Sequence, residues 1–507
     1  MSIPGLGQIP VQTSTTSART LKLTPLSEWR FTVGQPPIKV RLLNGTAERD
    51  GTELAANQPY SFAGVQSKIL TWHGCEIEVE GNVESSEVVA GGSKVPGVPS
   101  PQISYMNLHM LLASQRARAA TLPQSTGPRL LVCGPPHAGR TTLVRSLTAW
   151  ATKMTSTPSP NSAPPQQPCV INVDPREGML SLPGTLSAAV FATLMDLETE
   201  GGAGWGGAPS SGPSAVPVKL PLVYNYGYAR PSDAPDLYRQ LVTRLSGAVF
   251  ARIAEDPAVK SSGLLIDTPA VTTGEDEDDE DEYMPEGDDD ENDQKDDKEE
   301  GEAKEPRPKL MSIDLLTHVI EEFSVNMVVV LGQSSESIAI RESLEQRLVG
   351  DAATTSTGEP IQVVQLDSSD GVVARTDSVE QQQREACIKE YFFGDTKRTL
   401  SPYTQQVDGE TLTVFRLPPS GDEGGSHRVV KFEASPALAH WTLAVMNAGL
   451  HDPPDVVQQA TVQGFVYVAE VDGERRKVRV LAPVSGRLGD RPLVFGRWPE
   501  PYINLVG

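Results

Sequence analysis

A glycine-framed loop is the part of this chain best equipped for chemistry. An apolar run at 130–133 leads into the residues GPPHAGRTT at 134–142, and Leu143 then begins a helical pattern. This is the phosphate-binding loop G-x-x-x-x-G-K-[ST] with Arg140 in place of the lysine. The backbone amides of such a loop and the N-terminus of its helix bind a polyphosphate, and the Thr141 hydroxyl would bind Mg²⁺. The alternative, a chance glycine turn, requires strand, spacing, Thr141 and helix to coincide.

Arg140 separates nucleotide binding from nucleotide turnover. The lysine of the motif is a compact, mobile charge between the β- and γ-phosphates, whereas arginine carries a wide planar fork. The substitution keeps the positive charge but changes the space that the side chain needs. We therefore predict a nucleotide site with a weakened capacity for phosphoryl transfer.

Two aspartates follow later apolar runs. Asp174 comes at the end of the run at 170–174, and Asp267 at the end of the run at 264–267. Ligands of open parallel sheets bind at the carboxyl ends of the strands, so we expect both carboxylates beside Thr141 and the metal. There a carboxylate holds Mg²⁺ or accepts a proton from an attacking hydroxyl. The alternative is that each aspartate caps the helix or turn that follows it.

Hydrophobic patterning predicts the elements that position these residues. Short apolar runs alternate with helical segments, which is typical of an α/β domain with a parallel sheet. The runs lie at 130–133, 170–174, 220–224, 264–267 and 327–331, and helices are expected at 103–120, 232–254 and 312–323.

The chain on either side of this α/β region is richer in strands. Between 21 and 92, short alternating runs separated by turns predict a small β-sandwich or barrel-like domain, followed by a linker at 90–101. From Ser401 onward, strand-like runs predict a second small β-rich domain. These runs lie at 463–470, 476–482 and 492–496.

The 507 residues are enough for two to four domains. We expect a disordered tail at 1–20, an N-terminal β domain at 21–100, a P-loop domain at 101–400 and a C-terminal domain at 401–507. The P-loop domain is expected to carry three insertions on the rim of its sheet, at 155–168, 199–217 and 274–309.

The net charge of −23 is concentrated in one segment. Residues 275–305 hold 20 acidic residues against three lysines, so they carry −17 and leave −6 for the rest of the chain. A nucleic-acid partner for the folded part is therefore not excluded. The segment itself is typical of a solvated, disordered insertion, with a docking tail for basic proteins or an RNA mimic as the alternatives. The basic cluster at 475–479 is interpreted as the solvent face of a strand rather than a targeting signal or an RNA patch.

Several function classes are disfavoured by composition. The four cysteines are widely spaced and form no C-x-x-C pair, which is typical of reduced intracellular thiols. The seven histidines have no ligand spacing, so no structural metal is predicted. The N-terminus has no features of a signal peptide, and no apolar run approaches about 18 residues. We expect a soluble protein of the cytosol or nucleus that has no membrane partner.

Sequence blocks along nearly the whole chain carry a family resemblance. They are EWRF at 28–31, RLLNGTAE at 41–48 with GTEL at 51–54, TWHGC at 71–75, the P-loop, DP at 174–175 with LPGT at 182–185, SDGVV at 369–373, IKEYFFG at 388–394 with LSP at 400–402, and GFVYVAE at 464–470. The chain resembles the polynucleotide 5′-hydroxyl kinase family. Within it, the chain is most similar to the ATP-binding subunit of the pre-mRNA cleavage and polyadenylation machinery (cleavage factor IA in fungi, cleavage factor II in animals). The TWHGC and YFFG blocks are the most specific part of this resemblance.

The resemblance implies ATP and Mg²⁺ held between the N-terminal and P-loop domains, and a small α/β domain at the C-terminus. Glu28 would meet the adenine edge. Either Gln66, which the spacing favours, or Lys68, which the chemistry favours, would cover the base. In an active member Asp174 would be the general base, and Arg140 and Arg375 would clamp the phosphoryl group. The residues that would wrap the phosphates are His137, Ala138, Gly139, Arg140, Thr141 and Thr142.

Four departures from the active family pattern affect catalysis. Active members carry a lysine at the place of Arg140 and a glutamine at the place of Glu177. Where they have Thr-x-Gly-Trp, with a tryptophan that stacks on the RNA base, this chain has TPAV at 268–271. Their lid carries a second arginine five residues after Arg375, where this chain has Glu380, and a lysine where it has Asp377. One such arginine is worth ~10³-fold in rate, and a lost stacking platform costs roughly 1–3 kcal/mol of base binding.

These residues predict an ATP·Mg²⁺-binding scaffold subunit of the nuclear mRNA 3′-end cleavage machinery, without kinase activity. The nucleotide would join the first two domains, another cleavage-factor subunit would dock on the central domain, and pre-mRNA would be met within the complex. The main alternative is an active 5′-hydroxyl polynucleotide kinase. A nucleotide switch that hydrolyses ATP ranks last, because no water-positioning residue is identifiable.

Overall fold

The computed structural model describes residues 18–95, 97–122, 125–153, 166–198, 205, 219–273, 310–348, 353–394, 399–419, 428–483, 488–501 and 505. The predicted tail lies outside the described residues except for 18–20, of which Arg19 and Thr20 already belong to strand β1. The predicted insertions also lie outside them, except for 166–168 and Trp205.

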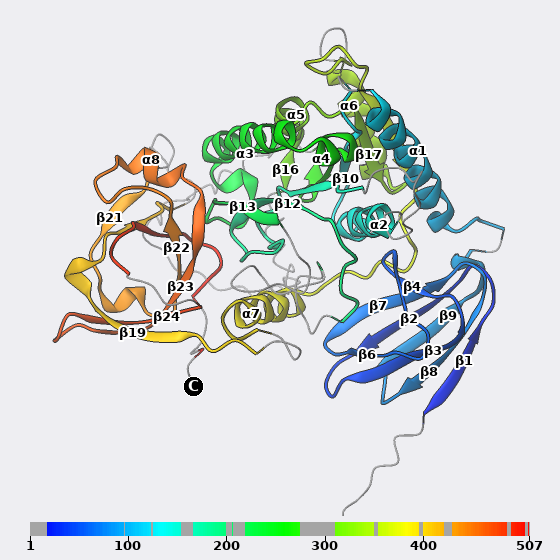
Figure 1. The fold of residues 1–507 in the computed structure, drawn as a ribbon, viewed down its shortest axis with the longest axis horizontal. Helices are drawn as coiled ribbons and strands as arrows, with labels where there is room; N and C mark the ends of the chain where they lie inside the picture. The colour runs from blue at the N-terminus through cyan, green and yellow to red at the C-terminus, as the bar shows by residue number, and fades with distance from the viewer. Residues whose placement is uncertain are drawn as a thin grey trace, which may run out of the picture.

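The N-terminal strands form a sandwich of two antiparallel sheets, as predicted (Figure 1). One sheet has the order β1-β8-β3-β6 and the other β5-β4-β7-β2-β9. Residues alternate between core and solvent along β3, where Ile38, Val40 and Leu42 are buried. The strands are β1 (Arg19–Leu23), β2 (Ser27–Val33), β3 (Ile38–Gly45), β4 (Glu48–Arg49), β5 (Thr52–Glu53), β6 (Pro59–Phe62), β7 (Val65–Thr71), β8 (Cys75–Glu80) and β9 (Ser85–Val89).

The central sheet has seven strands in the order β13-β12-β11-β14-β10-β17-β18. Five neighbouring strands of this sheet, β11, β14, β10, β17 and β18, are parallel, which confirms the predicted α/β class. Strands β11, β14, β10 and β17 are buried because helices cover both faces of the sheet, whereas the edge strand β18 is only partly buried. The strands are β10 (Arg129–Cys133), β11 (Cys169–Asn172), β12 (Thr185–Val190), β13 (Lys219–Asn225), β14 (Leu264–Asp267), β17 (Met327–Leu331) and β18 (Gln362–Leu366).

Two strands at one edge of this sheet depart from the prediction. The run at 220–224 was expected in the parallel sheet, but β13 pairs antiparallel with β12, which itself pairs antiparallel with β11. The link between β11 and β12 contains no helix, so the chain returns beside β11 in the opposite direction. Strands β12 and β18 were not predicted.

The helices of the central region lie on both sides of the sheet (Figure 1). Leucines of α1 and α2 pack on one face, and those of α3 and α5 on the other. A short parallel pair, β15 (Val271–Thr272) and β16 (Met311–Ser312), lies beyond β14. The helices are α1 (Pro101–Thr121), α2 (Arg140–Lys153), α3 (Pro235–Glu255), α4 (Pro257–Ser262), α5 (Ile313–Glu322), α6 (Ser335–Arg347) and α7 (Asp377–Phe393).

The C-terminal part is a seven-stranded sheet in the order β19-β24-β23-β22-β25-β20-β21. It is β-rich, as the strand-like runs predicted, and its one described α-helix, α8 (Pro454–Gln458), is short. Helix α7 packs on it, since the amide of Phe465 donates to the Tyr391 hydroxyl at 2.8 Å. The strands are β19 (Tyr403–Asp408), β20 (Val414–Arg416), β21 (Val430–Phe432), β22 (Thr442–Met446), β23 (Val462–Asp472), β24 (Lys477–Ala482) and β25 (Leu493–Phe495).

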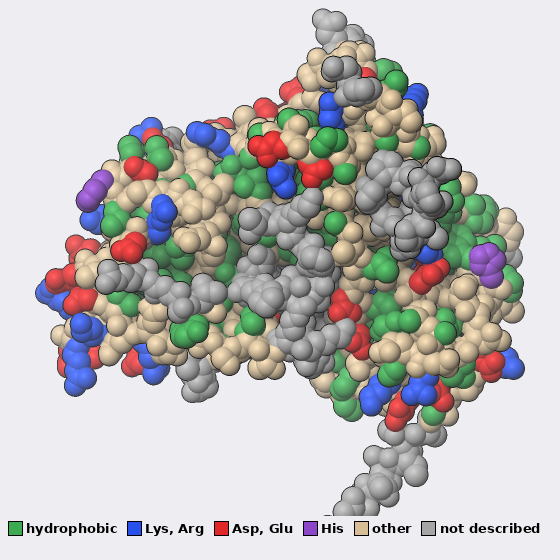
Figure 2. Space-filling model, in the orientation of Figure 1, with side chains coloured by type: hydrophobic (Ala, Val, Ile, Leu, Met, Phe, Trp, Pro, Cys, Tyr) green, Lys and Arg blue, Asp and Glu red, His purple; other side chains and the backbone are tan. Residues whose placement is uncertain are grey.

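The surface of the C-terminal sheet carries charges of both signs. Figure 2 shows acidic and basic side chains interspersed over β19 and β24 at the left of the molecule. Each basic residue of the 475–479 cluster pairs with a carboxylate, which supports a solvated strand face over an RNA patch. The pairs are Arg475 with Asp472, Arg476 with Glu410, Lys477 with Asp408 and Arg479 with Glu470.

In the described part of the chain, no helix combines the length and apolarity needed to cross a membrane. The four cysteines are buried and unpaired, and burial raises the pKa of each thiol.

Candidate nucleotide site

The P-loop follows β10, an interior strand of the sheet, and runs into the first turn of α2, which begins at Arg140. Its turn requires glycine at both ends: Gly134 has φ 154° and Gly139 has φ 87°, and a Cβ at Gly134 would lie 2.9 Å from the Leu331 carbonyl. His137 between them is also left-handed, with φ 56°. The first helical hydrogen bond runs from the Leu143 amide to the Gly139 carbonyl, so the amides before it have no helical acceptor. The loop therefore has the backbone form and the helix N-terminus that bind phosphate.

The Arg140 guanidinium is directed at backbone carbonyls of its own site. Its Nε donates to the Thr268 carbonyl at 3.1 Å, and its Nη1 donates to the carbonyls of Gly134, at 3.0 Å, and Pro135. A lysine at this position has three donors on a mobile stem, whereas the fork of arginine is held here at several points. The charge remains in the site, but two of the three guanidinium nitrogens, Nε and Nη1, donate to backbone carbonyls and not to a phosphate.

Asp267 at the end of β14 lies beside Thr141. The two side chains share a hydrogen bond, and Asp267 is 2% exposed. Its Oδ1 is buried and has no hydrogen-bond partner in the described part of the chain. Burial raises the pKa of Asp267 to about 8, with the charge of Glu177 as a smaller contribution. A buried carboxylate oxygen without a donor, next to a threonine hydroxyl, fits a Mg²⁺ ion that arrives with a nucleotide.

The described residues do not form a metal site from protein side chains alone. No group of three or more His, Cys, Asp or Glu side chains is arranged to hold a metal within the ranges that the structure covers. A cation at Thr141 and Asp267 would therefore need ligands from phosphates or water, as Mg²⁺ usually does.

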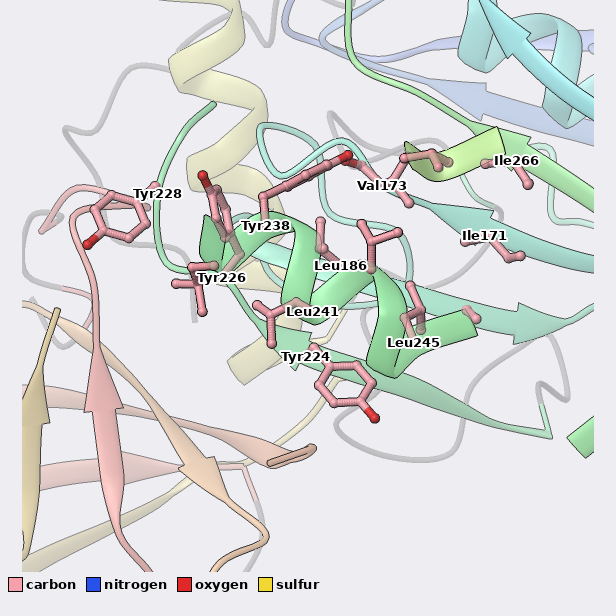
Figure 3. Packing of buried hydrophobic residues seen from close by; sticks show 14 of the residues in the cluster. Ile171, Val173, Leu186, Tyr224, Tyr226, Tyr228, Tyr238, Leu241, Leu245 and Ile266 are labelled. Atoms are coloured by element: carbon pink, nitrogen blue, oxygen red, sulfur yellow. The ribbon is translucent and has the colours of Figure 1, made fainter. Parts of the chain in front are cut away.

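Asp174 lies in a turn after β11 that hydrogen bonds from the buried residues Tyr238 and Asn172 stabilise. The Tyr238 hydroxyl donates to the Val173 carbonyl at 2.9 Å, and Figure 3 shows this ring reaching Val173 from α3. Asn172 fixes the turn itself, because its Oδ1 accepts from the Asp174 amide at 3.0 Å. Burial raises the pKa of Asp174 to about 6, and the neighbouring Glu177 adds to the shift. Asp174 is thus a carboxylate in the range of a general base.

The lid residues meet this turn through two ion pairs. Arg375 Nη1 lies 2.8 Å from Glu177 Oε1, and Arg176 Nη2 lies 2.6 Å from Glu380 Oε2. The charge of Glu177 raises the pKa of Arg375, which keeps this guanidinium protonated. The cation predicted to clamp a phosphoryl group is therefore already paired with a carboxylate.

The place of the stacking tryptophan is filled by core residues. Val271 is fully buried, and the Thr268 hydroxyl donates to the Val132 carbonyl at 2.9 Å. Neither side chain offers an open face to a nucleic-acid base.

Glu28 lies on the sandwich face that adjoins the central region. The side chain is fully buried, and its two oxygens accept from Arg30 Nε at 2.8 Å and Lys68 Nζ at 2.9 Å. Lys68 pairs with Arg30 across the β2–β7 ladder, while Gln66 lies two residues further out and is exposed. Lys68 is therefore the neighbour of Glu28 in this structure, and Gln66 is not.

The segment after β18 contacts both the sandwich, which carries Glu28 and Lys68, and the P-loop. The Asp370 carboxylate pairs with Arg30 and also accepts from the Lys94 amide. One residue further, a Cβ at Gly371 would lie 2.6 Å from Arg30 Nε, and Val372 Cγ2 would lie 3.3 Å from a Cβ at Gly139 of the P-loop. Residues 370–372 thus contact both the sandwich and the P-loop.

A buried carboxylate joins the sandwich to α2. Glu48 Oε1 accepts from Trp72 Nε1 at 3.1 Å and from Trp150 Nε1 at 3.2 Å. Burial raises the pKa of Glu48, although the indole hydrogen bonds oppose the shift. Arg145 on α2 pairs with Asp50 at 3.2 Å beside it. The sandwich is therefore held against the P-loop helix by polar contacts between buried and partly buried groups.

Sequence reasoning missed several residues of this region. Arg30 could have been found, because strand alternation places it on the same face as Glu28. Asp370 lies within the SDGVV block but was given no role. The pairing partner of Glu380, Arg176, left no signal in the linear sequence.

Comparison with known proteins agrees with the fold. Residues 22–119 match the family described as N-terminal beta-sandwich domain of polyadenylation factor. Residues 134–278 match mRNA cleavage and polyadenylation factor CLP1 P-loop, and 400–500 match Pre-mRNA cleavage complex II protein Clp1. The fold thus defines a P-loop α/β protein with a β-sandwich before it and a family-specific β-rich part after it.

Full-length relatives identify the family. The mRNA cleavage and polyadenylation factor CLP1 of Pyricularia oryzae is 45% identical over 519 residues, and that of Chaetomium globosum is 42% identical over 560, each with 100% of both chains covered. The chain belongs to the CLP1 family of mRNA cleavage and polyadenylation factors, which confirms the resemblance. A solved wild-type Clp1p–Pcf11p complex matches with a TM-score of 0.74 at 24% identity, covering 95% of this chain and 98% of that one. A second Clp1p structure with similar values carries a point mutation and is described as giving the basis for ATP loss.

Proposed function

We propose that this chain is an ATP·Mg²⁺-binding scaffold subunit of the nuclear mRNA 3′-end cleavage and polyadenylation machinery that does not transfer phosphate. One observation carries the proposal: the Arg140 guanidinium is bound to the carbonyls of Gly134, Pro135 and Thr268. The pairing of Arg375 with Glu177 supports it, because both predicted phosphate clamps are then engaged elsewhere. A phosphoryl-transfer transition state needs free positive groups around its equatorial oxygens.

Nucleotide binding itself is supported by the geometry of the loop. The segment from His137 to Thr142 would wrap the phosphates, and Thr141 with Asp267 would hold Mg²⁺, which would supply charge neutralisation when bound. The family resemblance assigns Glu28 to the adenine edge and Lys68 to the face of the base; since these two side chains are ion-paired with each other here, contact with adenine would require this pair to rearrange. Since the sandwich and the P-loop both contact residues 370–372, a nucleotide between them would stabilise their arrangement. Ligand at 1,000 times its Kd adds about 4 kcal/mol to the folded state.

The partner is another subunit of the cleavage factor. The relatives are cleavage and polyadenylation factors, and the solved neighbour is in complex with Pcf11p. We infer that a subunit homologous to Pcf11p docks on the central domain of this chain, and that the protein contacts pre-mRNA as part of that assembly.

A catalytic alternative is favoured by one observation. The pKa of Asp174 is raised to about 6, which suits a general base for an RNA 5′-hydroxyl. Under this alternative the chain would be a 5′-hydroxyl polynucleotide kinase that uses Asp174, Arg140 and Arg375.

One experiment separates the two functions. One portion of the purified protein is denatured, and its bound nucleotide is identified by chromatography. A second portion of the same preparation, kept native, is tested for transfer of labelled γ-phosphate to a 5′-hydroxyl RNA oligonucleotide. We expect stoichiometric intact ATP and no transfer above an Asp174→Asn control. Transfer by the wild type that disappears in Asp174→Asn would establish the kinase and refute the scaffold.

A further inference from the structure

Two of the residues that depart from the kinase pattern, Glu177 and Glu380, form ion pairs between the same two segments of the chain. Glu177 and Glu380 lie on different segments, and each pairs with an arginine on the opposite one: Glu177 with Arg375, and Glu380 with Arg176. The lid (residues 367–380) and the turn after β11 therefore each contribute one positive and one negative charge. The two substitutions create a crossed set of attractions where the active pattern has arginine and glutamine.

The other end of the lid is anchored to different parts of the molecule. The Tyr105 hydroxyl on α1 donates to the Asp367 carbonyl at 2.7 Å. Asp370 pairs with Arg30 of the sandwich and accepts from the Lys94 amide. Between the two anchored ends, Val372 lies against Gly139 of the P-loop. The lid therefore crosses the phosphate loop and is tied down on both sides of it.

We propose that the crossed ion pairs latch the lid over the P-loop, so that bound nucleotide is released slowly and acts as a resident component. The inference rests on the proposed function and specifies how that site keeps its ligand. The N-terminal end of the lid is fixed to α1 and the sandwich, so the lid opens at its C-terminal end. This end carries Arg375 and Glu380, and both ion pairs must therefore separate before the lid can open.

The latch is also expected to depend on salt. The four side chains are between 24% and 40% exposed, so their attraction is partly screened by solvent ions. Increasing ionic strength should therefore accelerate nucleotide release, and neutralising one member of an ion pair should do the same at constant salt.

The test is a double-mutant cycle on the Arg176–Glu380 pair, read by nucleotide release. Full-length wild type, Arg176→Gln, Glu380→Gln and the double variant are loaded with radiolabelled ATP and Mg²⁺ and chased with unlabelled ATP. We expect each single variant to release the label about 3- to 10-fold faster, and the double variant to lie within about twofold of either single one. Glu385→Gln is the matched control, because it removes a charge on the same helix whose partner, Lys389, lies on that helix.

The outcomes distinguish the latch from the proposed function. Wild type that retains ATP while both single variants release it at the same rate as the wild type overturns the latch alone. A double variant whose acceleration is the product of the two single effects does the same, because the two side chains would then act independently and not as a pair. Wild type that retains no ATP overturns the proposed function, and the residence claim with it.

Discussion

Replacing Asp267 with asparagine should stabilise the nucleotide-free protein and abolish its response to Mg²⁺. In the folded protein, burial raises the pKa of this carboxyl from its ordinary 3.8 to about 8. The folded state then keeps a proton that the unfolded chain releases above about pH 4, so stability falls as the pH rises from about 4 to 8. This pKa shift lowers the free energy of unfolding by roughly 5 kcal/mol at pH 8 and by roughly 3 kcal/mol at pH 6, relative to its value below pH 4. Asparagine does not titrate and avoids this cost.

The assay is thermal unfolding of nucleotide-free protein at pH 6 and pH 8, with and without Mg·ATP. For a domain of this size 1 kcal/mol moves Tm by about 2–4 °C, so Asp267→Asn should raise Tm by about 10 °C at pH 8 and by about half as much at pH 6. The wild type should gain strongly from Mg·ATP, because a cation beside the unpaired Oδ1 offsets the cost of burying the charge. Asp267→Asn should gain the same from ATP with or without Mg²⁺.

Asp236, exposed at the start of α3, serves as the control. Its change to asparagine should move Tm by no more than about 2 °C at either pH. The reasoning about Asp267 fails if Asp267→Asn lowers Tm without ligand at pH 8, or if the variant keeps the full Mg²⁺-dependent gain.

Three further predictions concern the rest of the site. Arg140→Lys should not restore phosphate transfer to a 5′-hydroxyl RNA, since the lid pairs and the filled stacking site remain; robust transfer in the labelling assay would disprove the independence of these losses. Glu28→Ala should lower stability by about 3–5 kcal/mol in denaturant titrations, because it leaves Arg30 and Lys68 without their buried carboxylate, and equal stability of variant and wild type would contradict that pairing. Glu48→Ala should speed protease cleavage at 90–101 by loosening the sandwich from α2, whereas Glu48→Gln, which keeps an acceptor for the indoles, should do so much less; identical cleavage of the two variants would rule out the hydrogen bonds as the cause.

Local patterns were sufficient to predict most of the architecture. Alternation along strands such as β3 gave the sandwich, and the apolar runs before the P-loop and the strand-end aspartates gave the parallel sheet. Strand β12 was not predicted, because its sequence TLSAAV has neither a continuous run of large apolar side chains nor alternation to distinguish it. The run at 220–224 was predicted as a strand, but its pairing with β12 was not. The direction of β12, opposite to that of β11, depends on a helix-free connection that no single sequence window reveals, and β13 returns in the direction of β11.

The sequence by itself determined the P-loop, since its spacing and glycines are local requirements of a backbone that wraps phosphate. It also indicated that Asp267 ends β14 and that Asp174 closely follows β11, because the carboxyl ends of parallel strands share an edge of the sheet. The tertiary structure decided where the charges go. Glu177 and Arg375 are 198 residues apart and Arg176 and Glu380 are 204 apart, and at such distances the chain imposes no geometry on a side-chain pair. The direction of the Arg140 fork was likewise set by the carbonyls that surround it in the folded site, which a linear motif does not contain.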